Sequence, residues 1–545
     1  MACFRERIVA IIRWIILSSL KWADIIEDYT LFEMMTYLSE TWGLGFARAA
    51  GIINVFYGVT KILSLSFAFL VDACLGNVKM LLLSGLASSI GLAFLSMSTP
   101  PVLSNLAGNC NRYDEKCVGP AQKAIFFTSL VLMGVGMAGN AVSVDTFLQN
   151  HDSKKNILNF IVGAIAALAL PFLKPWQVRF GVAGIIFFVA TLIFFVGTVR
   201  RAYSHKDDDD PNGSALTTVL RVFVAATRKS CHQLPANPND LYQGHGNHDN
   251  FAKQLPHTNR CRWLDKAAVV SQEKSGRVDE GEEKNNEESR SSWKLCTVGE
   301  VEETKICLQT AILWTSFIIC GLVSSSGNTF FVAQAAKMNR GIGKWQVHPT
   351  ILLLLSNGAK YLLEFNNKHG YRCLRKCLGC CGCNLIAALV SIASSMLNAV
   401  LCCLSAAVVE SMRRKNIDSP MSIFWLIPQF YFLTILDSLF EEAVEDFFED
   451  HEVPALKKYA VHLLRFVCGL GQVGSVVLSV WVCKKWFKDE VDESRLDKYY
   501  WALTALSAVN LIWYVIVAVV YYVKFKPRFK SKPGDPTPTP TPCCC

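Results

Sequence analysis

About twelve stretches of mostly apolar residues, each near the length that crosses a bilayer, constrain this chain more than any other feature. A helix needs about 20 consecutive apolar residues to span the hydrocarbon core, and soluble domains rarely contain such runs. Because a helix satisfies its backbone hydrogen bonds internally, the runs predict an all-α membrane protein. They fall at roughly 8–38, 47–71, 79–98, 123–148, 156–173, 180–199, 307–333, 347–364, 384–409, 422–447, 459–483 and 499–523.

The runs form two groups of about six, separated by a polar segment. We expect an N-terminal six-helix half at 1–201 and a C-terminal six-helix half at 307–524. A cytosolic linker at 202–306 would join the halves, and a cytosolic tail that ends in cysteines would follow at 525–545. Two six-helix halves around a midplane site are typical of the major facilitator fold, which about 12 transmembrane helices build.

Basic residues in the connecting segments bear on the orientation. An even number of spans places both termini and the linker on one side, and Lys524–Lys532 favours the cytosol for that side. Arg413 and Arg414 argue against it, because they would then lie outside. Asn212 begins a glycosylation sequon, which stays unmodified if the linker is cytosolic.

Composition narrows the class further. The net charge of +9 is spread through a chain that is 52% hydrophobic, which suits basic flanks of membrane spans and argues against a nucleic-acid partner. Within the linker, Ala215–Thr227 interleaves apolar residues with arginine and predicts an amphipathic helix at the membrane surface. Residues 205–215 and 270–290 have the composition of a disordered tether.

The cysteines support two different predictions. Cys110 and Cys117 lie in a hydrophilic loop on the expected outer side, where a disulfide can form. A second group of cysteines flanks basic residues at 372–383 or ends the tail, which is typical of acylation; a zinc site at 373–383 lacks a histidine or a second CxxC pair. The acylation candidates are Cys373, Cys377, Cys380, Cys381, Cys383, Cys543, Cys544 and Cys545.

The first apolar run continues into a charged stretch, Leu20–Leu38. On a helix, Lys21, Asp24 and Asp28 fall on one face, with Glu27 beside them. A charge at bilayer depth costs roughly 2.5–3.5 kcal/mol on insertion scales, so it usually faces a cavity or a partner. The alternative is that the span ends near Leu20 and that these acids are hydrated.

Four motifs resemble a known family. Gln254–Ala268 is similar to its HT-x-x-x-R-F-L-D-K-A segment, and Trp293–Lys305 to its W-x-L-C-T-V-x-x-V-E-E-x-K segment. Met421–Phe430 and Glu445–Asp450 are similar to the start and end of its tenth helix. On these residues the chain resembles the plant nitrate/peptide transporter family, a branch of the proton-coupled oligopeptide transporters. The resemblance implies a facilitator that moves a small solute by alternating access.

The chain departs from this family where the family couples transport to protons. Aligned on Thr36, the E-x-x-E-R motif of helix 1 falls on residues 20–24, and none of its three charged positions keeps its residue. Aligned on Asp145, the basic residue of helix 4 is Gly136. The nitrate-binding histidine of some members falls on Ser324. The resemblance therefore implies that the coupling motif is lost or replaced.

An acidic stripe follows helix 10, where Asp437 and Glu441 lie one turn apart. Asp437 aligns with a family carboxylate near the central cavity, whereas Glu445 and beyond fit the cytosolic end of the helix. Few cations are available opposite the acids of helices 1 and 10: Lys21, Lys61, Lys360 and Arg465. We therefore expect a neutral or cationic solute. A half-dry carboxylate can also take up a proton, so Asp24, Asp28 or Asp437 could replace the lost motif.

Helix 7 contains small and polar residues at Ser324–Gln334, which either line the pathway or allow close helix packing. Together the candidate pathway residues are Asp24, Glu27, Asp28, Lys61, Ser324, Asn328, Lys360, Asp437 and Glu441.

Two functions fit these patterns. The first is a secondary transporter whose partners are the bilayer, a small solute and, in case coupling persists, protons. The second is a transport-inactive relative that acts as a membrane receptor or scaffold. No P-loop, Rossmann glycine pattern, HExxH or GxSxG motif occurs in a supporting context, so we expect no enzyme, cofactor or metal. We expect a multi-pass protein of the plasma membrane rather than the vacuolar membrane.

Overall fold

The structure is a computed structural model, and the part of the chain that it describes is almost entirely helical. The described residues are 2–99, 119–148, 154–199, 215–231, 233–235, 237, 241–242, 257–269, 293, 295–363, 384–450, 454–488 and 490–525.

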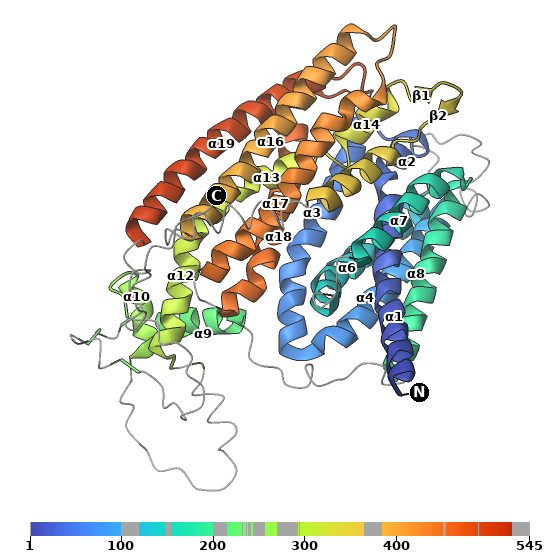
Figure 1. Cartoon of the computed structure of the whole chain (residues 1–545). Coiled ribbons are helices and arrows are strands. Elements are labelled where there is room, and N and C mark those ends of the chain that lie inside the picture. The colour runs from blue at the N-terminus through green and yellow to red at the C-terminus, as the bar shows by residue number, and fades with distance from the viewer. Residues whose placement is uncertain are drawn as a thin grey trace, which may run out of the picture.

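The N-terminal half contains a helix for each of its six predicted spans, and these helices lie together on the right in Figure 1. One predicted span, 47–71, leads through a single π-helical turn into the next. The elements are α1 (Ala2–Phe32), α2 (Met34–Glu40), α3 (Phe46–Leu70), η1 (Val71–Leu75), α4 (Gly76–Met97), α6 (Pro120–Leu148), α7 (Lys154–Ala169), η2 (Leu170–Phe172) and α8 (Trp176–Val199).

The long helices of the C-terminal half lie on the left in Figure 1, whereas its β1–β2 hairpin lies at the upper right; the half begins with a broken span. Its seventh predicted span is divided into three helices, and a short hairpin follows them. The elements are α12 (Val298–Thr315), α13 (Phe317–Ser324), α14 (Phe330–Ala336), β1 (Gly341–Ile342), β2 (Trp345–Gln346), the helix Thr350–Leu363, α16 (Asn384–Lys415), η6 (Ile423–Leu426), α17 (Ile427–Asp450), α18 (Pro454–Val477), η7 (Leu478–Val482), η8 (Lys484–Trp486) and α19 (Leu496–Phe525).

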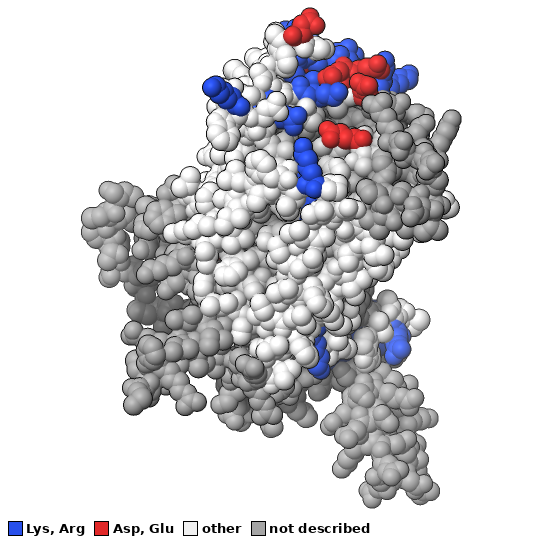
Figure 2. All heavy atoms as spheres, turned by 90° about the vertical axis from the view of Figure 1, so that its right-hand side faces the viewer, with Lys and Arg blue, Asp and Glu red and all other residues white. Residues whose placement is uncertain are grey.

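Seven described helices are long and apolar enough to cross a membrane, and the bent pair α12 and α13 adds an eighth. One of the seven, Phe46–Met97, contains two predicted spans that turn at Gly76, whose φ is 69°. The remaining predicted spans are α1, which carries charges, and two shorter apolar helices, Ile157–Phe172 and Thr350–Leu363. In Figure 2 a broad band without charged residues separates charged groups near the two ends, as expected for a surface that faces lipid.

The two halves contact each other through small residues on α3 and α18. A Cβ atom on Gly58 would lie 2.9 Å from Gly469 O, and one on Gly469 would lie 2.6 Å from Gly58 O. Four residues from Gly58 on α3 and six residues from Gly469 on α18, Asn54 donates a hydrogen bond to Ser475 across 3.0 Å. Such glycines let two helix backbones approach, which is how membrane helices associate in the absence of a hydrophobic driving force.

The described part of the linker forms a small module at the base of α12 (Figure 1). Its helices are α9 (Ala215–Arg228), α10 (Arg262–Asp265) and η5 (Lys266–Ala268). The apolar side of α9, including Val222 and Ala225, packs against Leu264 and Val301 within the module. We expected this helix to place its apolar side in a membrane surface. Instead, the rest of the linker covers that side, because residues far apart in sequence complete its core.

Candidate functional site

Acids and cations from both halves meet near the middle of the bundle. We call this set the central charge cluster: Asp28, Lys61, Lys360, Asp437, Glu441 and Arg465. Asp28 is exposed and interacts electrostatically with Lys360 of the opposite half. Asp437 is likewise exposed and interacts with Lys61 of the opposite half and with Lys360 of its own half. Since exposed charges face one another across the two halves, the space between them is open to solvent.

Asp437 has one direct partner among the described residues. The Ser324 hydroxyl, at the end of α13, donates a hydrogen bond to Asp437 Oδ1 across 2.7 Å. This contact joins two positions that the sequence singled out separately. It leaves the second carboxylate oxygen of Asp437 without a hydrogen-bond donor from the described residues, which suits a group that receives a solute.

Glu441 is paired more tightly. Arg465 of α18 reaches Glu441 Oε1 across 3.1 Å and also donates to the backbone oxygen of Ala141 in α6 across 3.2 Å. The guanidinium therefore connects an acid of the C-terminal half to the backbone of the N-terminal half. Arg465 is thus engaged on two sides and is not available as a free anion site.

The acids of α1 lie within one continuous helix, which runs on past Leu20 to Phe32. Asp24 is held by Lys21 and by Asn140 of α6, each across 3.3 Å. Glu27 is buried, with only 1% of its surface exposed. It accepts a hydrogen bond of 3.2 Å from Ser88 of α4, and its Oε1 has no hydrogen-bond partner among the described residues.

Gly136 of α6 packs closely against the part of α4 that contacts Glu27. A Cβ atom at Gly136 would lie 2.7 Å from the backbone nitrogen of Ser88 and 2.9 Å from Ser84 O. The glycine thus brings α6 against α4 at the height where Ser88 contacts Glu27. No side chain can occupy position 136 without separating these helices. Neither Ser88 nor Asn140 was among the residues predicted from the sequence.

The segment Ser324–Gln334, from the end of α13 into α14, has both predicted features: it contacts a candidate pathway residue and it allows close helix packing. Ser324 contacts the cluster, whereas Gly327 packs against Leu433 of α17, whose Cδ2 would lie 2.5 Å from a Cβ at the glycine. Asn328 is half-buried in the turn between α13 and α14. The structure therefore places Ser324, but not Asn328, in contact with another predicted pathway residue.

A second set of charged and polar residues, which sequence reasoning missed, lies at the end of the bundle opposite the linker. We call it the latch: Glu33, Arg179, His348 and Thr350. Arg179 of α8 forms a buried ion pair with Glu33, where α1 breaks into α2. His348 Nδ1 lies 3.4 Å from Glu33 Oε1. The one signal in the sequence was Arg179 itself, a charge at the edge of a long apolar run.

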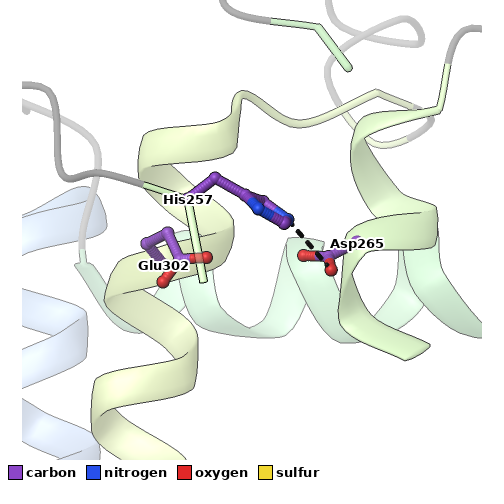
Figure 3. Close-up of side chains that lie close together, drawn as sticks. All are labelled: His257, Asp265 and Glu302. Atoms are coloured by element: carbon purple, nitrogen blue, oxygen red, sulfur yellow. Dashed lines mark hydrogen bonds and ion pairs between the residues drawn. The ribbon is translucent and has the colours of Figure 1, made fainter. Parts of the chain in front are cut away.

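A third cluster lies in the linker module. His257, Asp265 and Glu302 place ligand atoms within 4.8 Å of one another, a spacing that could hold a metal ion (Figure 3). Lys305 already lies among them, with its Nζ 2.5 Å from Asp265 and 2.8 Å from Glu302. Thr258 donates two further hydrogen bonds to Glu302. The ammonium group takes the place of a cation, so this cluster fastens the linker to α12 rather than fitting a metal.

The cysteines predicted to form a disulfide or to be acylated all lie outside the described residues, as does Asn212. They are Cys110, Cys117, Cys373, Cys377, Cys380, Cys381, Cys383, Cys543, Cys544 and Cys545.

Comparisons with known proteins agree with this architecture. A model of the POT family matches residues 78–485. Protein NRT1/PTR FAMILY 5.5 of Arabidopsis thaliana is 34% identical, over 95% of this chain and 99% of the relative. Protein NRT1/PTR FAMILY 5.6 of the same plant is 28% identical, over 89% of this chain and 86% of the relative.

Solved structures share the fold at lower identity. The crystal structure of an auto inhibited POT family peptide transporter superposes with a TM-score of 0.60 at 14% identity, over 92% of this chain and 96% of that chain. The in meso crystal structure of the POT family transporter PepTSo gives 0.61 at 17% identity, over 94% and 98%.

Proposed function

The chain belongs to the POT family of membrane transporters, and on that premise we propose that it moves a small neutral or cationic solute by alternating access. The family and its major facilitator fold account for transport by a multi-pass membrane protein. The nature of the solute and the state of the coupling machinery are specific to this chain and rest on its own residues.

The observation that carries the proposal is the charge balance of the central charge cluster. Arg465 is engaged by Glu441, and outside the cluster Lys21 is engaged by Asp24. Lys61 and Lys360 remain, and both interact with Asp437. A small anion such as nitrate would need a cation that no acid already balances. Each cation of the cluster has an acid near it, which favours a neutral or cationic solute.

Proton coupling is weakened or rebuilt in this proposal. The basic residue that the family carries in its fourth span aligns with Gly136 of α6, so it is absent here. Ser88 of α4 donates a hydrogen bond to Glu27 where a cation would otherwise be expected. Losing the motif acids at 20–24 together with their basic partner leaves none of those motif acids buried without its cation, which would be costly. Asp24, Asp28 and Asp437 are the carboxylates available to carry a proton instead.

Uptake measured in oocytes at two external pH values tests the proposal. The panel should contain nitrate, peptides, amines, hormones and secondary metabolites. We expect saturable uptake of a neutral or cationic compound, with a small dependence on pH. Saturable, pH-insensitive nitrate uptake by the purified protein would contradict the charge argument.

The departures from the coupling motif also favour a second candidate, a transport-inactive relative that serves as a receptor or scaffold. Transport of nothing across the whole panel, by protein shown to reach the membrane, would support it. We propose the plasma membrane as the location, which a fluorescent fusion imaged beside a vacuolar marker would test.

A further inference from the structure

One helix of the C-terminal half, Thr350–Leu363, touches the N-terminal half through polar contacts along its length. The Thr350 hydroxyl donates to the backbone oxygen of Ala167 in α7 across 2.9 Å. Two turns on, Asn357 donates to the Tyr29 hydroxyl of α1 across 3.0 Å. These contacts hold the halves together toward the end of the bundle that lies opposite the linker.

The latch extends this interface to residues that precede the helix Thr350–Leu363. His348 belongs to the connection that follows the β1–β2 hairpin. The hairpin is anchored in the C-terminal half, because Asn339, just before β1, exchanges two backbone hydrogen bonds with Met421 and Ile423. Glu33 and Arg179 belong to the N-terminal half, where Arg179 also donates to Pro171 O and Leu173 O. Separation of the halves at this end would therefore remove His348 from a fixed ion pair.

Hydrogen bonding fixes the state of the His348 ring in the closed latch. Thr350 gives its single hydroxyl proton to Ala167 O, so its oxygen can only accept from His348 Nδ1, which lies 3.2 Å away. The proton of a neutral ring is thus on Nδ1, directed toward Thr350 and Glu33. A second proton, on Nε2, would add a positive charge beside Arg179.

The groups that face His348 are Glu33 from the break between α1 and α2, Arg179 from α8, Arg340 directly before β1 and the uncharged Thr350. Burial, Arg179 and Arg340 together lower the pKa of His348 from 6.5 to about 4. Burial comes first among these causes. Separation of the halves would remove Arg179 together with its ion-pair partner Glu33, so relief of burial is the change that raises the pKa of His348.

We propose that His348 is a proton-sensitive gate residue, neutral while this end of the bundle is closed and protonated once the halves part there. The inference rests on the alternating access proposed above. A state that binds a proton more tightly gains population as pH falls, so acid on this side favours the open latch. Between pH 7.5 and pH 5.5 the ratio of open to closed molecules should rise by up to about tenfold.

This gate differs from proton coupling in where the proton goes. His348 takes up its proton from the side to which the latch opens and returns it to the same side on closure. The proton bound by His348 thus does not cross the membrane with the solute. Transport can therefore depend on pH in a chain that lacks the coupling motif of its family.

Amide hydrogen exchange of the purified full-length protein tests the gate without any transported solute. Peptides covering 165–180 and 346–358 report the latch, and rates are corrected for the intrinsic effect of pH on exchange. We expect faster corrected exchange at pH 5.5 than at pH 7.5 in the wild type. In His348→Gln, which keeps a hydrogen-bonding side chain but cannot titrate, the difference should vanish.

Two further variants make the outcome decisive. His257→Gln removes a histidine at the linker end and should leave the pH response of the latch unchanged. Thr350→Val removes the hydroxyl acceptor but keeps His348, so exchange should rise at both pH values while the pH response persists. A pH response that survives His348→Gln, or a wild-type protein without one, would overturn the gate. A normal gate in a protein that transports nothing would overturn the proposed function instead.

Discussion

Gly136 of α6 lies so close to Ser88 of α4 that a Cβ atom at the glycine would come within 2.7 Å of the Ser88 backbone nitrogen. Ser88 in turn donates a hydrogen bond to Glu27, a carboxyl group buried to 1% exposure. Position 136, which the resemblance aligns with the family's basic residue, is a close contact between two helices. We propose that the loss of the family's ion pair is built into this packing.

Gly136→Ala should destabilise the protein, because α4 and α6 must move apart to admit the methyl group. Overpacking of this kind costs about 1–3 kcal/mol. Gly474→Ala is the matched control, since no atom lies within 4 Å of a Cβ there and alanine favours a helix. Thermal unfolding in detergent should show a lower midpoint for Gly136→Ala and an equal or higher one for Gly474→Ala. The opposite order would refute the packing account.

Asp437→Asn should abolish most transport, because the exposed carboxylate of the central charge cluster loses its charge. Ser324→Ala should have a smaller effect, of about fivefold, since one hydrogen bond to a charged group contributes about 1 kcal/mol at an exposed site. Initial uptake rates, normalised to the amount of protein in the membrane, are the measurement. Glu445→Gln, a similar change on an exposed position two turns along α17, should leave uptake unchanged. Equal losses in all three variants would count against a specific role for Asp437.

Arg465→Gln should cost more stability than Glu441→Gln. The arginine loses both the carboxylate and its hydrogen bond to Ala141 O, whereas the glutamate loses only the ion pair. A double-mutant cycle on thermal unfolding should give a coupling energy of about 1 kcal/mol, as for partly exposed pairs. Equal single costs would show that the contact between α18 and α6 contributes little.

Lys305→Met should loosen the linker module, because Asp265 and Glu302 are left buried without a cation. Breaking a buried ion network in this way costs roughly 3–5 kcal/mol. Limited proteolysis should cut the linker faster, whereas Lys344→Met, at an exposed lysine of the hairpin, should behave like the wild type.

Zinc and chelator provide a separate test of the same cluster. Because the ammonium group of Lys305 lies where a metal would bind, neither added Zn²⁺ nor EDTA should shift the thermal midpoint of the wild type. Stabilisation by zinc would show that a metal displaces the lysine.

The sequence predicted the architecture well because span length and apolarity are local properties. The all-α fold with two six-helix halves and the family were confirmed, whereas the span expected at 307–333 is divided into three helices. The acids of α1 also lie inside a helix, as the alignment required, since the helix continues to Phe32. Helix α9 was predicted to be amphipathic, but its covering partners, such as Leu264 and Val301, could not be inferred from its own pattern.

The parts that sequence reasoning missed depend on the register between distant helices. Arg179 and Glu33 are 146 positions apart, and nothing local marks them as partners. Ser88 is one serine among several in α4, and only the depth at which Gly136 meets it gives it a role. His348 was hidden because the predicted span began at 347, whereas the helix begins at Thr350 and leaves the histidine in a connection.

The most direct test of the account is solute uptake into liposomes that contain only this protein. Wild type and Asp437→Asn should be reconstituted in parallel and supplied with the same panel of solutes, with and without a proton gradient. We predict saturable uptake of a neutral or cationic solute that largely disappears in Asp437→Asn and changes little with the gradient. Saturable nitrate uptake that Asp437→Asn leaves intact would contradict the account.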